Sequence, residues 1–434
     1  MERRSFLKSL GTGLGAASLT SVFDPATISH VEAATTRVAT QSATAVAENE
    51  SYWRDVQQAF SVSRAMINLN NGYCCPSPRI VTEAVVDYTW QQEEAPAYTL
   101  ARLLPPFREP VRQGLARVFG TDPEEIALVR NASEAMETLL LGLDLKSGDE
   151  VVTTTQDYGR MRTALHQRER REGIQIKYFK VPVPATDEQL IEAFGTAISE
   201  RTKMVLMSHQ INLTGQILPV KEIADIARER GNIPVMVDGA HSFAQFDFKQ
   251  EDLGCDFFGT SLHKWLFAPK GTGMLYVKRD RIKDIWPLMA APDRLNDNIR
   301  KFEEIGTHSE APYLATGEAI TFHNTIGGER KEARLRYLKD YWAKQLVELP
   351  GVRLHTSFDP QLSCAIANVE LVGTNPRDMR DYLWDKHKII VAPIMHDEFQ
   401  GLRITPNVYT TLDELDFFCE IFEHIQKNGL PKSA

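Results

Sequence analysis

Between residues 126 and 277 the chain alternates short, almost uniformly apolar runs with longer amphipathic segments. The apolar runs are IALV at 126–129, VVTT at 151–154, IKYFKV at 176–181, MVLMS at 204–208 and VMVD at 235–238. Strands that alternate with helices build a parallel sheet, because each helix returns the chain to the same edge. Strands without a polar face belong to a sheet covered on both sides. The pattern predicts an α/β fold, with MLYV at 274–277 as a further edge or antiparallel strand.

The character of the sequence changes after about residue 294. A long helical pattern at 317–349 is followed by short apolar runs at 364–370, 389–391 and 402–404, and by a final helical pattern at 411–426. These elements predict a second, smaller α+β domain. Ahead of the alternating region, helical patterns occupy 51–66, 78–93 and 110–119. We therefore expect a leader and linker at 1–48, a segment at 49–77 that joins the small domain, a large domain at 78–293 and a small domain with its connecting helix at 294–434.

The overall composition restricts the classes of partner. The chain has 434 residues and a formal net charge of −9, from 49 basic and 58 acidic side chains. An acidic balance disfavours nucleic acid or an anionic membrane as the main partner. The five cysteines form no CxxC pair and show no zinc-site spacing, so we expect neither a disulfide framework nor a metal site.

The first residues resemble a twin-arginine export signal. The run MERRSFLKSLGTGLGAASLTSVF places Arg3 and Arg4 before a mildly apolar stretch, with Glu2 where serine or threonine is usual. That stretch is too short and too mild for a stable membrane span. We expect the twin-arginine export machinery as a partner and a periplasmic or otherwise exported mature protein. Small-residue cleavage sites occur at 31–33 and 43–45, within a stretch rich in Ala, Thr and Ser that is typical of a linker.

Two residues at predicted strand ends form the most telling chemical pair. Asp238 ends the VMVD run, and Lys264 follows a second apolar run, Phe257–Phe258. A carboxylate can keep a pyridine nitrogen protonated, while a lysine amine forms a Schiff base with an aldehyde. Singly, the residues are better explained as a strand-end cap and a surface cation. Together they indicate a site for a pyridine aldehyde.

A phosphate site is expected where the first strand of the large domain gives way to a helix. Asn131, Ala132 and Ser133 lie at this point, and Glu134 follows Asn131 with the spacing of a capping box. The unpaired amides of a helix start attract a phosphate. An ordinary N-cap is the alternative interpretation. Because ligands of parallel sheets bind beyond the carboxyl ends of the strands, we expect this turn to share a site with Tyr158, Asn212 and Asp238.

These residues carry a resemblance that spans nearly the whole chain after the leader. VMVDGAHS, TSLHKWLFAPKGTG and NASEA resemble the fold-type I pyridoxal-phosphate enzymes of the class V aminotransferase superfamily, most of all the isopenicillin N epimerase-like branch. The resemblance implies a large domain with a mostly parallel seven-stranded sheet covered by helices, and a smaller C-terminal α+β domain. It also implies pyridoxal 5′-phosphate as the cofactor.

The resemblance assigns roles around the cofactor. Lys264 would form the Schiff base and move protons, and Asp238 would pair with the pyridinium. His241 would lie at the phenolic oxygen or support Asp238, Tyr158 would stack on the ring and Asn212 would bond the ring oxygen. The phosphate would be held by the remaining residues of the set, namely Asn131, Ala132, Ser133, Ser261 and His263.

Further roles concern the substrate and a second subunit. Arg403 in GLRITPNV would bind the substrate carboxylate, because a planar guanidinium holds a carboxylate through two hydrogen bonds. Asn71, in the turn INLNNGY, is a second candidate for substrate binding. Thr307 in FEEIGTHSE would reach the phosphate of the neighbouring subunit, which implies a homodimer. The substrate would be a small amine or amino acid.

The sequence leaves the reaction open. We rank transamination first, because Lys264 alone can move the proton that it requires. Epimerisation needs a second acid or base, for which Tyr158, His209 and Tyr73 are the candidates. No cysteine occurs at 385–400, where related desulfurases carry their nucleophile, so desulfuration is disfavoured, but β-elimination and other C–S lyase reactions stay open.

A cofactor-binding protein without turnover and a tailoring enzyme for secreted peptides or siderophore-like amines are further alternatives. Cys74 and Cys75 lie near the expected site, and residues 93–109 are a candidate lid or an interdomain contact.

Overall fold

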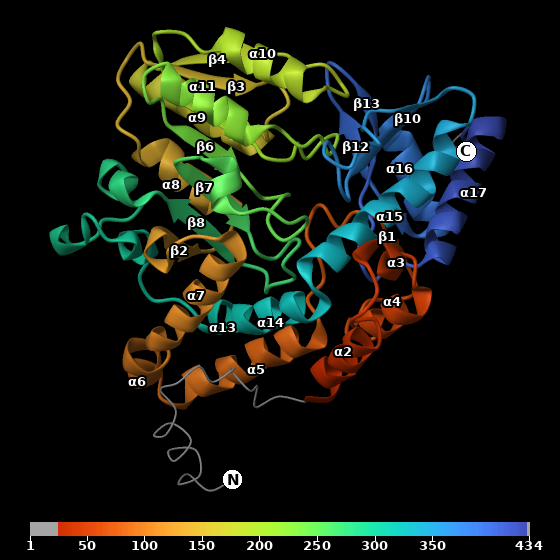
Figure 1. Ribbon diagram of the computed structural model, residues 1–434, viewed down its shortest axis with the longest axis horizontal. Coiled ribbons are helices and arrows are strands. Elements are labelled where there is room, and N and C mark those ends of the chain that lie inside the picture. Colours follow the sequence, from red (N-terminus) through yellow and green to blue (C-terminus); the bar gives the residue numbers. More distant parts are fainter. Residues whose placement is uncertain (1–24, 432–434) are drawn as a thin grey trace, which may run out of the picture.

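The computed structural model describes residues 25–431, and the proposed twin-arginine signal lies outside them. Its largest element is a seven-stranded sheet in the order β2-β8-β7-β6-β5-β3-β4 (Figure 1). The strands are β2 (Ile126–Val129), β3 (Glu150–Thr154), β4 (Gln175–Phe179), β5 (Thr202–Ser208), β6 (Val235–Asp238), β7 (Phe257–Ser261) and β8 (Gly273–Val277). Only β8 runs antiparallel, to both β2 and β7. The sheet is mostly parallel, as predicted. The MLYV strand β8 is antiparallel, one of the two predicted options, and lies inside the sheet rather than at its edge.

Helices cover both faces of this sheet. One face packs on α5 (Arg79–Glu94), α7 (Arg108–Phe119), α10 (Asp187–Ala197) and α11 (Val220–Glu229), and the other on α8 (Ala132–Gly142) and α9 (Gly159–Glu172). Successive residues of a strand enter opposite cores: Val205 lies in the first and Leu206 in the second. Each fully buried side chain of this kind contributes about 1.5–3 kcal/mol. Two-sided burial explains why the strands are apolar without alternation.

The remaining segments of the large domain are short. Residues 96–107 form α6 (Pro96–Tyr98), a π-helical turn η1 (Thr99–Leu103) and a 3-10 turn η2 (Pro105–Phe107). The other short elements are η3 (Pro123–Glu125), α12 (Gln250–Leu253), η4 (Arg279–Asp284), η5 (Asp293–Leu295) and η6 (Ile299–Glu303).

The small domain carries its own sheet beside the large one, in blue in Figure 1. Its antiparallel order is β12-β13-β10-β9, and a separate parallel pair joins β1 to β11. The strands are β1 (Ile67–Asn68), β9 (Val352–Leu354), β10 (Ala367–Leu371), β11 (Ile389–Ile390), β12 (Ala392–Met395) and β13 (Gln400–Ile404). Helices α15 (Gly328–Val347), α16 (Pro376–His387) and α17 (Leu412–Asn428) cover this sheet. Through β1 the N-terminal segment is part of the small domain's structure.

Two helical predictions differ from the structure. The predicted helix at 317–349 is interrupted at Gly327, whose φ of 89° no helix accommodates, and so becomes α14 (Thr316–Ile326) and α15. Together with α13 (Ala311–Leu314), α14 packs on α5 and α7 of the large domain. We had predicted that the small domain begins at residue 294, whereas the segment 294–326 packs on the large domain. The predicted helix at 51–66 is only α4 (Glu50–Gln57).

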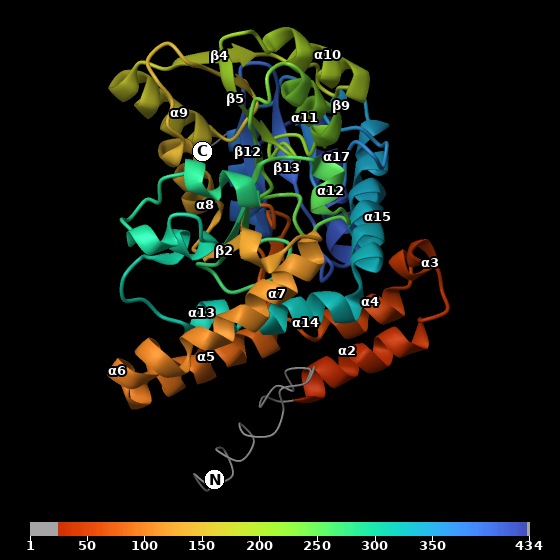
Figure 2. The same cartoon turned by 60° about the vertical axis from the view of Figure 1, so that its left-hand side comes forward.

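The stretch that we interpreted as a linker is folded in its second half. It forms α2 (Pro25–Arg37) and α3 (Ala43–Ala47), which lie along the base of the molecule with α4 (Figure 2). Val31, Ala34 and Val46 are buried in one cluster with Trp265, which follows Lys264. Both small-residue cleavage sites fall within these packed helices. No helix in the range 25–431 is long and apolar enough to cross a membrane.

The packing of α2 predicts a difference between two neighbouring alanines. Ala34 is 1% exposed, whereas Ala33 lies on the solvent side of the same helix. Ala34→Asp buries an unpaired carboxylate and is expected to lower the free energy of unfolding by about 2–4 kcal/mol. Ala33→Asp should change it by less than ~0.5 kcal/mol. Denaturant unfolding measures both, and equal effects would mean that α2 is not packed as described.

Candidate active site

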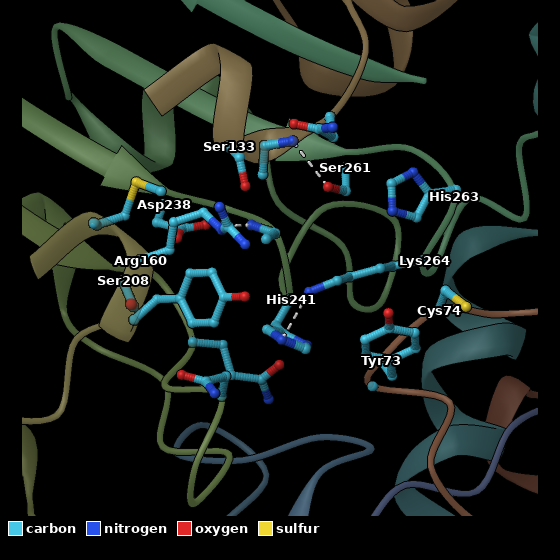
Figure 3. A pocket seen from close by; sticks show the side chains of 18 of the residues that line it. Tyr73, Cys74, Ser133, Arg160, Ser208, Asp238, His241, Ser261, His263 and Lys264 are labelled. Atoms are coloured by element: carbon cyan, nitrogen blue, oxygen red, sulfur yellow. Dashed lines mark hydrogen bonds between the residues drawn. The ribbon is translucent and has the colours of Figure 1, made fainter. Parts of the chain in front are cut away.

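A cavity of about 660 Å³ opens at the carboxyl ends of the parallel strands (Figure 3). All the residues predicted to bind cofactor or substrate line it, except Asn71 and Thr307: Asn131, Ala132, Ser133, Tyr158, Asn212, Asp238, His241, Ser261, His263, Lys264 and Arg403. They come from the strand ends and loops of the large domain and, with Arg403, from β13 of the small domain. The cavity therefore lies where the two domains meet, at the place where parallel sheets bind their ligands.

Lys264 extends into this cavity from the loop after β7. Its Nζ lies 3.0 Å from Nε2 of His241, as the dashed line in Figure 3 shows. Burial, above all, lowers the pKa of Lys264 to about 8. The negative charge of Asp238 raises this pKa, and the positive charge of Arg403 lowers it. Burial and the charges of Lys264 and Arg403 hold the pKa of His241 well below its usual range, so this imidazole is neutral and accepts from the amine. A lysine with a lowered pKa is a ready nucleophile.

The loop that carries Lys264 makes a tight turn and is held in place by contacts with Lys331. Phe267 adopts a φ of 64°, rare for a residue with a bulky side chain, and its amide donates to the Lys264 carbonyl at 3.2 Å. Lys331 of α15 is fully buried, donates to the Trp265 carbonyl and lies 4.3 Å from the Phe267 ring centroid. These contacts fix the direction from which Lys264 enters the cavity.

Asp238 faces the cavity from the end of β6. The side chain is buried, and Oδ1 accepts from the Ala240 amide at 3.0 Å. Burial raises the pKa of Asp238 to about 6, while the Ala240 amide and the Lys264 charge oppose the rise. A buried carboxylate without a salt bridge gains most from a cationic partner, and a pyridinium is one.

The turn predicted to bind the phosphate lies at the start of α8, and its cap differs from the expected capping box. Oδ1 of Asn131 accepts from the Glu134 amide at 2.9 Å, but the Glu134 carboxylate bonds Arg130 instead of completing a capping box. The Ala132 amide donates to Oγ of Ser261 at 2.9 Å, which joins the start of α8 to the end of β7. A Cβ on Gly273 would lie 2.7 Å from the Asn131 backbone, so only glycine lets β8 approach this turn.

Arg403 is a buried cation with neutral partners. Nη1 donates to the Asn212 carbonyl at 3.0 Å, Nη2 donates to Oδ1 of Asn70 at 2.9 Å, and Nε has no partner. No carboxylate within residues 25–431 pairs with it, and burial lowers the pKa of Arg403 to about 10. This buried guanidinium therefore has no anionic partner among the described residues.

Asn71 is a structural residue, contrary to the prediction that it binds substrate. It is fully buried, donates to the backbone carbonyls of Asn68 and Thr405, and accepts from the Tyr409 hydroxyl. Its amide is thus fully used in joining the turn to the small domain. The neighbouring Asn70 touches Arg403 instead.

The loop before Tyr158 is hydrogen-bonded to the small domain. The Thr155 hydroxyl donates to Glu398 at 2.5 Å, Gln156 donates to the same carboxylate at 3.0 Å, and His396 Nε2 donates to the Thr155 carbonyl at 3.1 Å. These bonds set the distance between the domain that carries Tyr158 and the strand that carries Arg403. Tyr158 itself is 43% exposed, which leaves its ring free to cover a ligand.

Several other predictions fall away from the cavity. Thr307 is exposed and does not line it, so its role toward a second subunit stays a prediction. His209 is buried between Phe246 and Phe248 and burial lowers its pKa to about 3, which excludes it as a second acid or base. No residue of the candidate lid 93–109 is part of the cavity wall.

The cysteines fall into two groups. Cys75 and Cys364 are buried, and burial raises the pKa of each to about 12, which keeps both as unreactive thiols. Only Cys74, partly buried, lines the cavity, next to the exposed Tyr73. Sequence reasoning missed several further lining residues, among them Arg160, Gln210 and Lys270. Arg160 lies two residues after Tyr158 and Gln210 two before Asn212, so a wider window at each strand end would have included them.

The cavity fits pyridoxal phosphate in charge and in hydrogen bonding. It offers an amine, a buried carboxylate and a helix start at three separate places. Nδ1 of His241 and Oδ1 of Asn212 are buried without a hydrogen-bond partner. Polar atoms in that state are rare in folded proteins unless a ligand or water satisfies them.

Comparisons with known proteins identify relatives of this chain. A family model described as aminotransferase class-V matches residues 75–393. The isopenicillin N epimerase of Streptomyces clavuligerus is 32% identical, over 84% of this chain and 96% of its own length. An apo cysteine desulfurase from Thermococcus onnurineus NA1 has a similar structure, with a TM-score of 0.76, 23% identity, and coverage of 87% of this chain and 98% of its own. The structure of a C-DES mutant with glycine covalently linked to its PLP cofactor gives a TM-score of 0.75 at 20% identity, over 84% and 98%.

The matches establish the fold as that of fold-type I enzymes and the cofactor as pyridoxal phosphate. This chain belongs to the class V aminotransferase family.

Proposed function

We propose that this enzyme removes the Cα proton of an α-amino acid, or of a larger amine that carries an α-carboxylate. The observation behind the proposal is Arg403, a buried guanidinium that holds only neutral partners and faces the same cavity as Lys264. A bidentate carboxylate on Arg403 fixes the substrate backbone at one end, with its amine directed toward Lys264.

Each residue has a separate task in this reaction. Bound pyridoxal phosphate withdraws electrons from the substrate Cα and so acidifies its proton. Asp238 keeps the ring nitrogen protonated, which this withdrawal requires. Lys264 would accept the Cα proton at Nζ, which lies in the cavity. Neutral His241 holds Nζ in position through the 3.0 Å contact and adds no competing charge.

Where Lys264 returns the proton decides the reaction. Transamination would need Lys264 as its only proton carrier, and Nζ of Lys264 is held 3.0 Å from Nε2 of His241. Return to the opposite face of Cα gives epimerisation, which is favoured by the 32% identity to an isopenicillin N epimerase and by the phenols of Tyr73 and Tyr158 in the cavity wall. Desulfuration through a cysteine nucleophile has no residue in 385–400 to carry it.

Deuterium exchange separates the two reactions. The holoenzyme is incubated in D₂O with each of a panel of L-amino acids, and the products are analysed by chiral chromatography and mass spectrometry. Transamination gives a 2-oxo acid and the amine form of the cofactor, while epimerisation gives the D-enantiomer with deuterium at Cα. Turnover of no α-amino acid or α-carboxylate amine, with neither product nor exchange, would contradict the proposal.

The lowered pKa of Lys264 predicts how cofactor loading depends on pH. Only the neutral amine attacks the cofactor aldehyde, and the pKa of Lys264 is about 8. The rate constant for incorporation of pyridoxal phosphate into apoprotein should therefore rise as pH increases through about 8 and then level off. Stopped-flow absorbance follows the reaction. A rate that still climbs near pH ~10.4, the ordinary lysine value, would contradict the account.

Arg403→Lys should weaken selection for the α-carboxylate. Lysine keeps the charge but cannot form the two parallel hydrogen bonds, a loss of about 1.5–3 kcal/mol, or roughly 10- to 100-fold in Kd. Titration of the cofactor absorbance with L-amino acids and their α-amides measures the preference for the acid. Arg353→Lys, on the same small-domain sheet and 63% exposed, is the control that should leave it unchanged. An unaltered preference in Arg403→Lys would exclude Arg403 as the carboxylate site.

Two further proposals concern the cell and the assembly. We propose export by the twin-arginine route, supported by Arg3 and Arg4, with processing ahead of the packed helix α2. If the wild-type protein stays in the cytoplasm to the same extent as an Arg3→Lys, Arg4→Lys variant, the export proposal is wrong.

We also propose a homodimer in which the exposed Thr307 reaches the neighbouring phosphate. A monomer by sedimentation at working concentration would exclude this.

A further inference from the structure

Asn70 contacts Arg403 from outside the reaction cavity. Oδ1 of Asn70 accepts from Nη2 of Arg403 at 2.9 Å, yet Asn70 is not part of the cavity wall that Arg403 lines. On the other side of the guanidinium, the Asn212 carbonyl accepts from Nη1 at 3.0 Å. A guanidinium has five N–H groups, so these two bonds leave three donors for a ligand. Asn70 therefore contacts the guanidinium without taking the place that a ligand needs.

The turn that carries Asn70 is fixed against β13. The Asn70 amide donates to Oδ1 of Asn68 at 3.0 Å, and Asn70 forms a parallel bridge with Thr405, two residues after Arg403. A Cβ on Gly72 would lie 3.3 Å from Cζ of Arg403, so the guanidinium packs directly on this turn. The side chain at position 70 is therefore held within hydrogen-bond distance of the buried charge.

An amide and a carboxylate at this position have opposite consequences for Arg403. The amide oxygen of Asn70 satisfies one N–H group and leaves the positive charge without an anion. A carboxylate of the same shape would form a salt bridge and supply that anion. Among residues 25–431 the amide nitrogen of Asn70 has no hydrogen-bond acceptor, so an aspartate here would break no existing bond.

We propose that Asn70 is a specificity-determining residue, because its neutral side chain positions Arg403 and leaves the charge free to select an α-carboxylate over an α-amide. The inference rests on the proposed function, in which Arg403 binds the substrate carboxylate. It goes further by assigning the selection to a second residue, which lies outside the cavity wall. A carboxylate at position 70 would compete with the substrate for the same cation and would repel it.

Asn70→Asp should stabilise the protein and weaken substrate binding at the same time. The salt bridge to Arg403 should raise the Tm of the substrate-free holoenzyme by about 1–3 °C. Titration of the cofactor absorbance measures binding of L-alanine, L-methionine and L-glutamine, each beside its α-amide. Affinity for the acids should fall about 100-fold and affinity for the amides by less than about three-fold, so that the preference for the acid is lost. A purely structural role for Asn70 would lower Tm and affinity together.

Two further variants separate the added charge from the lost amide. Asn70→Ala removes the hydrogen bond to Arg403 without adding a charge, and the acids should remain preferred over the amides. Asn296→Asp makes the same change at an exposed residue outside the cavity wall, and it should alter neither Tm nor preference.

Three results would overturn the inference and leave the proposed function standing. They are a lower Tm in Asn70→Asp, an acid preference that survives in Asn70→Asp, and a preference lost as fully in Asn70→Ala as in Asn70→Asp. A wild-type enzyme that binds none of the three acids, or binds them no better than their amides, would instead contradict the role of Arg403 in the proposed function and remove this inference with it.

Discussion

The site depends on one electrostatic constraint: two cations, Lys264 and Arg403, are buried in one cavity with a single carboxylate, Asp238, and no salt bridge to it. Burial lowers the pKa of both cations, and it raises that of Asp238 to about 6. Such an arrangement costs folding free energy, and proteins retain it where a ligand supplies the missing charges. We propose that pyridoxal phosphate and a substrate carboxylate do so here. The neutral His241 belongs to the same constraint, because a charged imidazole 3.0 Å from Lys264 would add to the repulsion.

The fold holds these charges in place from three directions. The parallel sheet delivers Asp238 and the loop of Lys264 at neighbouring strand ends. The small domain contributes Arg403 from β13. Hydrogen bonds from Thr155 and Gln156 to Glu398 hold the small domain beside the loop that carries Tyr158. From below, Lys331 and the N-terminal helices pack around Trp265 and Phe267, directly after Lys264. A segment remote in sequence thereby stabilises the reactive amine.

Much of this was readable from the sequence, for physical reasons. Apolar runs buried on both faces fix the sheet, and chemistry-bearing residues at their ends mark the cavity, so Asp238, Lys264 and the Asn131 turn were placed correctly. The failures have causes that local patterns do not carry. Asn70 and Asn71 are adjacent in one turn, and only the tertiary bond of Asn71 to Thr405 decides which faces Arg403. His209 looked available because its strand-end position is right, yet two phenylalanines enclose it. The Ala-rich residues of α2 have linker composition but bury one face.

The central claim is that Lys264 is the amine that holds the cofactor, and covalent mapping tests it most directly. The holoenzyme is reduced with borohydride, digested, and the pyridoxyl label located by mass spectrometry. The account predicts the label on the peptide that contains Lys264, and its loss in Lys264→Ala. A label on Lys270, the other lysine of the cavity wall, or no label on a cofactor-loaded protein would contradict the account.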